Sequence, residues 1–165
     1  MKISDREYQE ALKYRTIIRR VGIVFEIEPS LIAGICSRES AFGLSLHPQG
    51  PAGTGDSGHG HGLMQLDDRW HAAFCATDRW KDPDENINEA VEMVLKPNLN
   101  AAIKKLKGAS ETDRLMVAIA GYNCGFESAR RAYRDFKDPD KYTTGGNYAL
   151  DVLARASFFT TKGWI

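Results

Sequence analysis

Apolar residues recur every three or four positions along most of this 165-residue chain, which is the spacing of amphipathic helices. The first such segment covers residues 4–25, and Ser4 has the side chain of an N-cap. The second begins near Pro29, which suits a first helical turn, and runs to about Ala41, with Gly43 as its stop. Further helices are predicted over residues 84–96, 98–107, 111–122, 126–136 and 146–162.

Local signals refine these later helices. Pro97 falls between the first two of them, so we expect a break or a kink there. Ser110 and Asp113 resemble a capping box at the start of the third. Residues 115–120, LMVAIA, are apolar on all sides and predict a buried central helix, while the glycine pair 145–146 marks the turn before the last helix.

The middle of the chain has a different pattern. Residues 50–62 hold six glycines in thirteen positions, which predicts a loop or a small irregular sheet. Residues 63–67, LMQLD, are predicted to form a short strand, in which Leu63, Gln65 and Asp67 would point the same way. The loop lacks the Gly-Lys-Ser/Thr of a phosphate loop, which argues against nucleotide binding. The whole pattern predicts a mainly α, globular helical domain with a small irregular β element.

Composition narrows the class of protein. The chain has the length of one domain, and we expect a single domain over residues 1–165 that is a monomer. The 22 basic residues balance 22 acidic ones, which argues against a nucleic-acid partner. No apolar run approaches the ~20 residues needed to span a membrane. The first residues lack the apolar core of a signal peptide, so a signal is either absent or already removed.

The three cysteines are odd in number, so at least one is unpaired within the chain. We expect Cys36, Cys75 and Cys124 all to be free, partly buried thiols, because a free cysteine behaves as a small hydrophobe. One disulfide is the alternative. We expect no metal site and no cofactor, because no Cys-x-x-Cys pair exists and the histidines near the loop show no evident ligand geometry. These histidines are His59, His61 and His71.

Glu39 is the first candidate for chemistry. Leu31, Ile35 and Glu39 are spaced by four, so the carboxyl continues an apolar helix face. Burial and the nearby helix C-terminus both raise the pKa of a carboxyl group, and a protonated Glu near neutral pH can act as a general acid. Periodicity alone favours the alternative, a Glu at the rim of the face that pairs with Arg38 or another base.

Two aspartates are the next candidates. Asp56 lies in the glycine-rich loop, where a short acidic side chain often caps a turn. Asp67 would share a polar strand face with Gln65, which suits either the wall of a polar cleft or a plain solvated face. Several aromatic residues could stack on sugar rings, although aromatics are more often part of a core. They are Trp70, Trp80, Tyr122 and Tyr148.

Five segments, in order, resemble the goose-type lysozymes, within the larger group that includes lytic transglycosylases. They are YRTIIRRVG (14–22), EPSLIAGICSRES (28–40), GHGLMQLD (60–67), GYNCG (121–125) and NYALDVLARASFF (147–159). The resemblance covers most of the chain, and its Ser-Arg-Glu-Ser, Gly-Leu-Met-Gln and Tyr-Asn-x-Gly elements are specific in combination. Cys124 departs from the usual small residue of the last element, and residues 72–86 follow the family weakly.

The resemblance implies a lysozyme-like fold and hydrolysis of the β-1,4 bond between N-acetylmuramic acid and N-acetylglucosamine in peptidoglycan, with inversion. It implies Glu39 as the proton donor, and Asp56 and Asp67 as the residues that position and activate the attacking water. The residues that it places along the sugar cleft are Gln65, His71, Tyr122, Asn123 and Tyr148. The implied partner is peptidoglycan or another glycan containing N-acetylglucosamine, and the implied place of action is outside the cell or at the cell wall.

Three alternatives stay open at this point. A lytic transglycosylase would use the same Glu39 but let the sugar's own 6-hydroxyl attack, and the two further acidic candidates argue against it. A chitinase would keep the machinery and change the sugar contacts. A non-catalytic sugar-binding module is expected to lose Glu39 or its partners, and none of them is lost.

Overall fold

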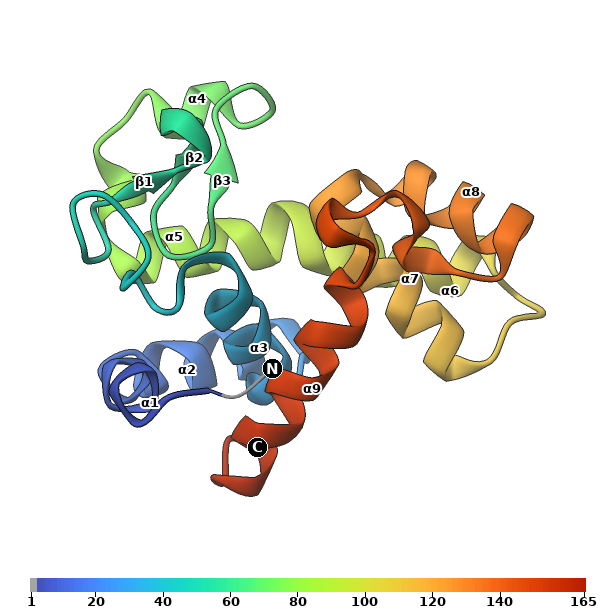
Figure 1. The fold of residues 1–165 in the computed structure, drawn as a ribbon, viewed down its shortest axis with the longest axis horizontal. Coiled ribbons are helices and arrows are strands. Elements are labelled where there is room, and N and C mark those ends of the chain that lie inside the picture. Colours follow the sequence, from blue (N-terminus) through green and yellow to red (C-terminus); the bar gives the residue numbers. More distant parts are fainter. Residues whose placement is uncertain (1–2) are drawn as a thin grey trace. The chain divides into compact units, whose positions relative to one another are not determined.

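The computed structural model describes residues 3–165, which divide into two compact units. The first unit comprises the described residues up to Val91 together with Ala154–Ile165, and the second comprises Glu92–Leu153. Both are mainly helical, and the first also holds a small antiparallel sheet, so the predicted fold class is confirmed (Figure 1). That the two units act as a single domain stays a prediction.

The first unit opens with two helices where the sequence predicted one over residues 4–25. Ser4 does cap the first of them, because its hydroxyl accepts a hydrogen bond from the Glu7 amide at 3.1 Å. The helical repeat breaks at Tyr14, whose buried ring stacks on Phe42 with ring centroids 6.3 Å apart. The hydrophobic spacing continues through this break, which is why periodicity did not locate it. The bounds are α1, Asp5–Leu12, and α2, Arg15–Phe25.

Helix α3, Pro29–Ser40, forms the centre of this unit. Pro29 lies in its first turn, as predicted. The helix ends earlier than Gly43, because Ala41 and Phe42 already adopt left-handed backbone conformations, with φ of 47° and 55°. Almost every residue of α3 is buried, and the fully enclosed ones include Ile32, Ile35 and Cys36.

The glycine-rich segment is a small irregular sheet, as predicted. Its strands pair in the order β1-β2-β3, all antiparallel, with Gly55 opposite Gly60 and Gly60 opposite Asp67. The predicted strand over residues 63–67 is wrong in its first half, because Gln65 is left-handed with φ of 50°. The alternation of side chains that it implied is therefore absent. The bounds are β1, Thr54–Gly55; the 3-10 turn η1, Asp56–Gly58; β2, Gly60–His61; and β3, Leu66–Asp67.

Pro97 does not interrupt the helix at its own position. A π-helical turn comes immediately before it, over Val91–Leu95, and helical backbone continues through Pro97. A proline ring clashes with the carbonyl four residues earlier, here that of Met93, and the wider π turn relieves that clash. The bounds in this part are α4, Ala72–Cys75; η2, Arg79–Lys81; α5, Pro83–Ala90; η3, Val91–Leu95; and α6, Lys96–Lys105.

In the second unit, α6, α7 and α8 pack side by side (Figure 1). The Ser110 hydroxyl accepts from the Asp113 amide at 3.0 Å, which confirms the predicted N-terminus of α7. Of the apolar run 115–120, residues 117–120 are buried, and the first two are half-buried. The remaining bounds are α7, Glu111–Cys124; α8, Phe126–Phe136; η4, Pro139–Tyr142; η5, Thr144–Gly146; and α9, Tyr148–Thr161.

All three cysteines are free thiols, as predicted. Cys36 is buried, and Cys75 and Cys124 are half-buried. Burial raises the pKa of all three thiols, that of Cys75 to about 11. They are therefore protonated at neutral pH. Within residues 3–165, no helix has both the length and the apolar character needed to cross a membrane.

Candidate active site

Glu39 lies in the last turn of α3, one residue before the helix ends. Its side chain is half-buried, whereas Leu31 and Ile35, on the same face, are buried. The helix therefore carries this carboxyl from the core of the first unit to the edge of its surface. The sequence predicted that position from the spacing of the three residues.

The two serines beside Glu39 anchor the end of its helix. The Ser40 hydroxyl donates to the Leu63 carbonyl at 2.7 Å and accepts from the Gly43 amide at 3.1 Å. Ser37 bonds to Glu7 of α1 and accepts from the Arg155 guanidinium of α9 at 2.6 Å. The residues that make these contacts are all buried. The backbone that carries Glu39 is consequently fixed from both sides.

The Ser40–Leu63 hydrogen bond connects the end of the Glu39 helix to the segment that holds Asp67. Leu63 lies in the turn between β2 and β3, and Asp67 is the last residue of β3. Asn86 of α5 holds the same turn, because its amide donates to the His61 carbonyl at 3.1 Å and accepts from the Met64 amide at 2.9 Å. Helices α3 and α5 thus fix the turn that precedes Asp67.

Gln65 lies across the two glycine-bearing strands. Its side-chain amide donates to the Gly62 carbonyl at 2.8 Å. Its side-chain oxygen is so close to the strands that a Cβ at Gly55 or Gly60 would approach it to 2.2 or 2.3 Å. The glycines of this loop therefore make room for the Gln65 side chain, which explains part of the glycine content of the sequence.

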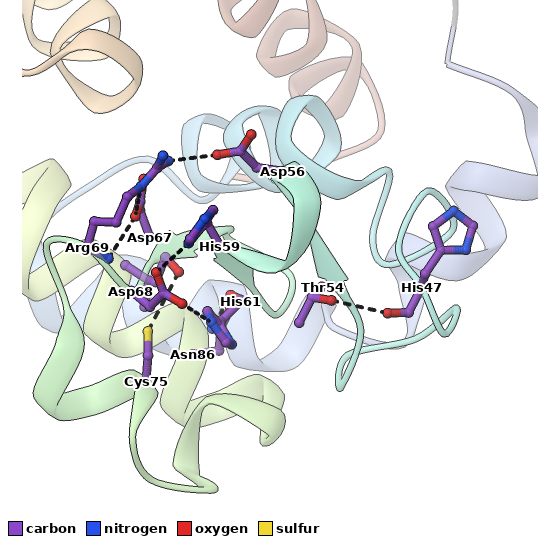
Figure 2. A network of polar contacts seen from close by, with 11 residues as sticks. His47, Thr54, Asp56, His59, His61, Asp67, Asp68, Arg69, Cys75 and Asn86 are labelled. Carbon is purple, nitrogen blue, oxygen red and sulfur yellow. Dashed lines mark hydrogen bonds and ion pairs between the residues drawn. The ribbon is translucent and has the colours of Figure 1, made fainter.

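Asp56 and Asp67 come together around one arginine, Arg69 (Figure 2). Arg69 donates from Nε to both Asp67 oxygens, at 2.8 and 3.0 Å, and from Nη2 to Asp67 at 2.5 Å and to Asp56 at 2.7 Å. The hydrogen bond from Arg69 holds the pKa of Asp67 below its usual value. Two of the three predicted catalytic carboxylates are thus brought together. Sequence analysis did not single out Arg69.

The carboxylate of a third aspartate, Asp68, bridges the two loop histidines. His59 Nδ1 lies 2.9 Å from one Asp68 oxygen, and His61 Nε2 lies 3.2 Å from the other. These contacts hold the pKa of Asp68 below its usual value. The edge of the Trp80 ring system contacts His61, with ring centroids 4.7 Å apart. Over the described part of the chain, no three His, Cys, Asp or Glu side chains form a group able to hold a metal ion.

His71 is half-buried and is the N-cap residue of α4, and its amide donates to the Asp67 carbonyl at 2.8 Å. The turn that connects these two residues exposes Trp70, whose side chain is 83% accessible. His71 therefore belongs to the same local structure as Asp67, as the predicted site requires.

The remaining predicted cleft residues belong to the second unit. Tyr122 is half-buried near the end of α7, and Asn123 is exposed and accepts a hydrogen bond from the Thr144 amide at 2.8 Å. Tyr148, the first residue of α9, is 1% exposed. That these three contact a sugar together with Glu39 stays a prediction.

Sequence analysis also missed Asp140, which orders the segment around Tyr148. Its two carboxylate oxygens accept from the Ala149 and Leu150 amides, at 2.8 and 3.1 Å, at the start of α9. Thr143 adds a further hydrogen bond at 3.1 Å. The local sequence does not mark this aspartate, because the two amides at the start of α9 lie 9 and 10 residues further along the chain.

Comparison with known proteins shows the family to which the chain belongs. The lysozyme g family profile matches residues 1–163. The chain is 32% identical to lysozyme g of Casuarius casuarius over 99% of its own length and 81% of that protein. It is 33% identical to lysozyme g of Gallus gallus, over 98% and 71% of the two chains, and 30% identical to that of Cyprinus carpio, over 99% and 81%. The chain therefore belongs to the goose-type lysozyme family, and it is a muramidase-type glycoside hydrolase.

Proposed function

We propose that the chain hydrolyses the β-1,4 bond between N-acetylmuramic acid and N-acetylglucosamine in peptidoglycan, with inversion at the anomeric carbon. Glu39 is the general acid in this proposal, and Asp67 and Asp56 hold the attacking water. The observation that carries it is the pairing of both aspartates with Arg69. Asp67 ends the β2–β3 hairpin, and Ser40 forms a hydrogen bond between the turn of this hairpin and the end of the Glu39 helix.

The proposed reaction has one displacement step. Glu39 gives its proton to the glycosidic oxygen as the bond from that oxygen to the anomeric carbon breaks. The oxygen of a water bonds to the anomeric carbon from the opposite face, and a proton of that water passes to an aspartate carboxylate. An inverting hydrolase needs one protonated and one ionised carboxyl group, on opposite faces of the sugar ring. The lowered pKa of Asp67 supports the ionised role for that residue.

Product analysis of digested peptidoglycan tests the reaction type. Hydrolysis by water is expected to give muropeptides with free reducing ends, and NMR of the fresh products is expected to show the inverted anomer. Muropeptides lighter by one water, with a 1,6-anhydro end, would identify a lytic transglycosylase instead. Cleavage of chitin oligomers at a higher kcat/KM than peptidoglycan would identify a chitinase.

Substitution of Glu39 tests the general acid. Glu39→Gln is expected to keep the melting temperature and lower the rate at least ~10²-fold, because the amide cannot give a proton to the leaving oxygen. Clearing of bacterial cell walls gives the rate. Glu28→Gln is the matched control, because Glu28 is an exposed glutamate at the other end of the same helix. A Glu39→Gln enzyme with near wild-type rate would refute the assignment.

A further inference from the structure

Arg69 connects the two aspartates through one nitrogen. Its Nη2 donates to Asp67 and to Asp56, while its Nε holds both oxygens of Asp67. The Arg69 amide also donates to Asp67 at 2.8 Å. Within residues 3–165, the carboxylate of Asp56 has no other side-chain partner. The place of Asp56 beside Asp67 therefore depends on this one guanidinium group.

The charges around Arg69 make that dependence strong. Asp56 lies in η1, Asp67 is the last residue of β3, and Asp68 follows it; Arg69 is the cation that Asp56 and Asp67 share (Figure 2). Like charges repel, so the ionised carboxylates of Asp56 and Asp67 would move apart without the guanidinium group that they share. Asp56 is the freer of the two, with a side chain 66% exposed, compared with 28% for Asp67.

The backbone conformation at Asp56 is a second reason why the position of this residue depends on Arg69. Asp56 and Ser57 both adopt left-handed conformations, with φ of 45° and 57°, which are unfavourable for residues other than glycine. A turn of this kind persists when surrounding contacts hold it. The contact that the Asp56 side chain makes is the one to Arg69.

We propose that Arg69 is a positioning residue, which gathers Asp56 and Asp67 into one water-holding pair. This inference rests on the proposed function, since the water in question is the one that attacks the sugar. An arginine suits the task better than a lysine, because its planar fork can hold both oxygens of one carboxylate and still reach a second. Arg69 need not touch the substrate in this role.

Three variants test the proposal by their rates. Arg69→Gln is expected to lower kcat by ~10-fold to ~100-fold with KM within about threefold, because a misplaced water slows the chemical step more than sugar binding. Arg69→Lys is expected to recover part of kcat. Arg79→Gln, which removes a comparable exposed pair with Glu85, is the matched control and is expected to leave the rate unchanged. Equal kcat for Arg69→Gln and the wild type would overturn the proposal.

The pH profile gives a readout that a merely structural role would not move. The titratable groups around Asp67 are Arg69, Asp56, His59, Asp68 and Cys75. Loss of the Arg69 hydrogen bond lets the pKa of Asp67 rise, so the acid limb of kcat/KM is expected to move to higher pH in Arg69→Gln. An unmoved acid limb would count against the proposal.

Carboxyl NMR separates this inference from the proposed function. Titration of the Asp56 and Asp67 side-chain carbons, without substrate, is expected to show a higher Asp67 midpoint in Arg69→Gln than in the wild type. A wild-type enzyme without activity on peptidoglycan would refute the proposed function, while the titration would still decide whether Arg69 holds the carboxylates. Unchanged midpoints in the variant would refute the pairing itself.

Discussion

Asp56 and Asp67 bond to the same guanidinium nitrogen, so a change at either residue alters the surroundings of the other. They are not equivalent. Asp67 ends a strand and binds Arg69 with both oxygens, whereas Asp56 lies on a turn and binds it with one. Asp67 is therefore the better-fixed holder of a water molecule.

We expect Asp67→Asn to lower kcat/KM more than Asp56→Asn, by ~100-fold against ~10-fold, because displacement of the better-fixed group misplaces the water more. The double variant is expected to lose less than the product of the two single losses, since both residues serve one water. Initial rates on cell-wall suspensions give all four values. Fully multiplicative losses would contradict the shared water and leave hydrolysis untouched.

Residues whose role depends on their own segment could be predicted from the sequence. The place of Glu39 on α3 follows from its spacing with Leu31 and Ile35, and the glycine content identified the loop of Asp56. Arg69, Asn86 and Ser40 could not be found in this way. Their contacts with Asp56, Met64 and Leu63 span 13, 22 and 23 residues of sequence and form only when distant segments fold together.

At the scale of elements, the β2–β3 hairpin is built around glycines with two different functions. At Gly62, φ is 71°, and an added Cβ would meet the Trp80 carbonyl at 2.8 Å and the Asn86 amide at 2.5 Å. At Gly60, the added Cβ would meet mainly the end of the Gln65 side chain, which is flexible. The backbone conformation therefore requires a glycine at position 62, and the Gln65 side chain requires one at position 60.

Alanine substitutions should separate these two functions. Gly62→Ala is expected to reduce the free energy of unfolding by about 2 kcal/mol or more, because backbone strain adds to a clash with fixed atoms. Gly60→Ala is expected to cost less than about 1 kcal/mol but to lower kcat/KM, because Gln65 must swing away from the strands. Urea unfolding and rate measurements test both. Equal loss of stability in the two variants would contradict the distinction.

The helices illustrate what periodicity can and cannot predict. Helix α8, Phe126–Phe136, has the predicted bounds, because its pattern and its ends coincide. The break at Tyr14 was not located, since the apolar spacing continues through it, and the break or kink expected at Pro97 takes the form of a π turn before that residue. The strand predicted over residues 63–67 failed because Gln65 turns left-handed to place its side chain over the glycines. The proline ring itself explains the π turn, whereas the departures at Tyr14 and Gln65 accompany contacts with other segments.

At the scale of the whole molecule, the end of the chain completes the first unit. Residues 154–165 belong to the same compact unit as the N-terminal helices. Trp164 is fully buried and packs against Phe159, with ring centroids 5.0 Å apart. Arg155 reaches Glu7, 148 positions earlier, at 3.3 Å. Contacts so distant in sequence cannot be predicted from local pattern. The family motifs indicated only the order of the segments along the chain.

This buried group of Arg155, Glu7 and Ser37 should control the stability of the first unit. All three residues are buried, and Arg155 donates hydrogen bonds to both of the others. Removal of the cation leaves the Glu7 charge buried without its partner, and such a loss costs about 3 kcal/mol or more. We therefore expect Arg155→Met to lower the free energy of unfolding by that amount. All three tryptophans lie in the first unit, so their fluorescence during urea unfolding reports on it.

Two further variants give this prediction its control. Arg20→Met removes an exposed pair with Asp84, which also lies in the first unit, and is expected to cost less than about 1 kcal/mol, because solvent screens that pair. Adding Glu7→Gln to Arg155→Met is expected to recover part of the lost stability, since the amide carries no buried charge and still accepts from Ser37. If Arg155→Met cost no more than Arg20→Met, the network would not be what joins α9 to α1 and α3. If the added Glu7→Gln made unfolding easier still, the cost would come from lost packing around Arg155 and not from an unpaired charge.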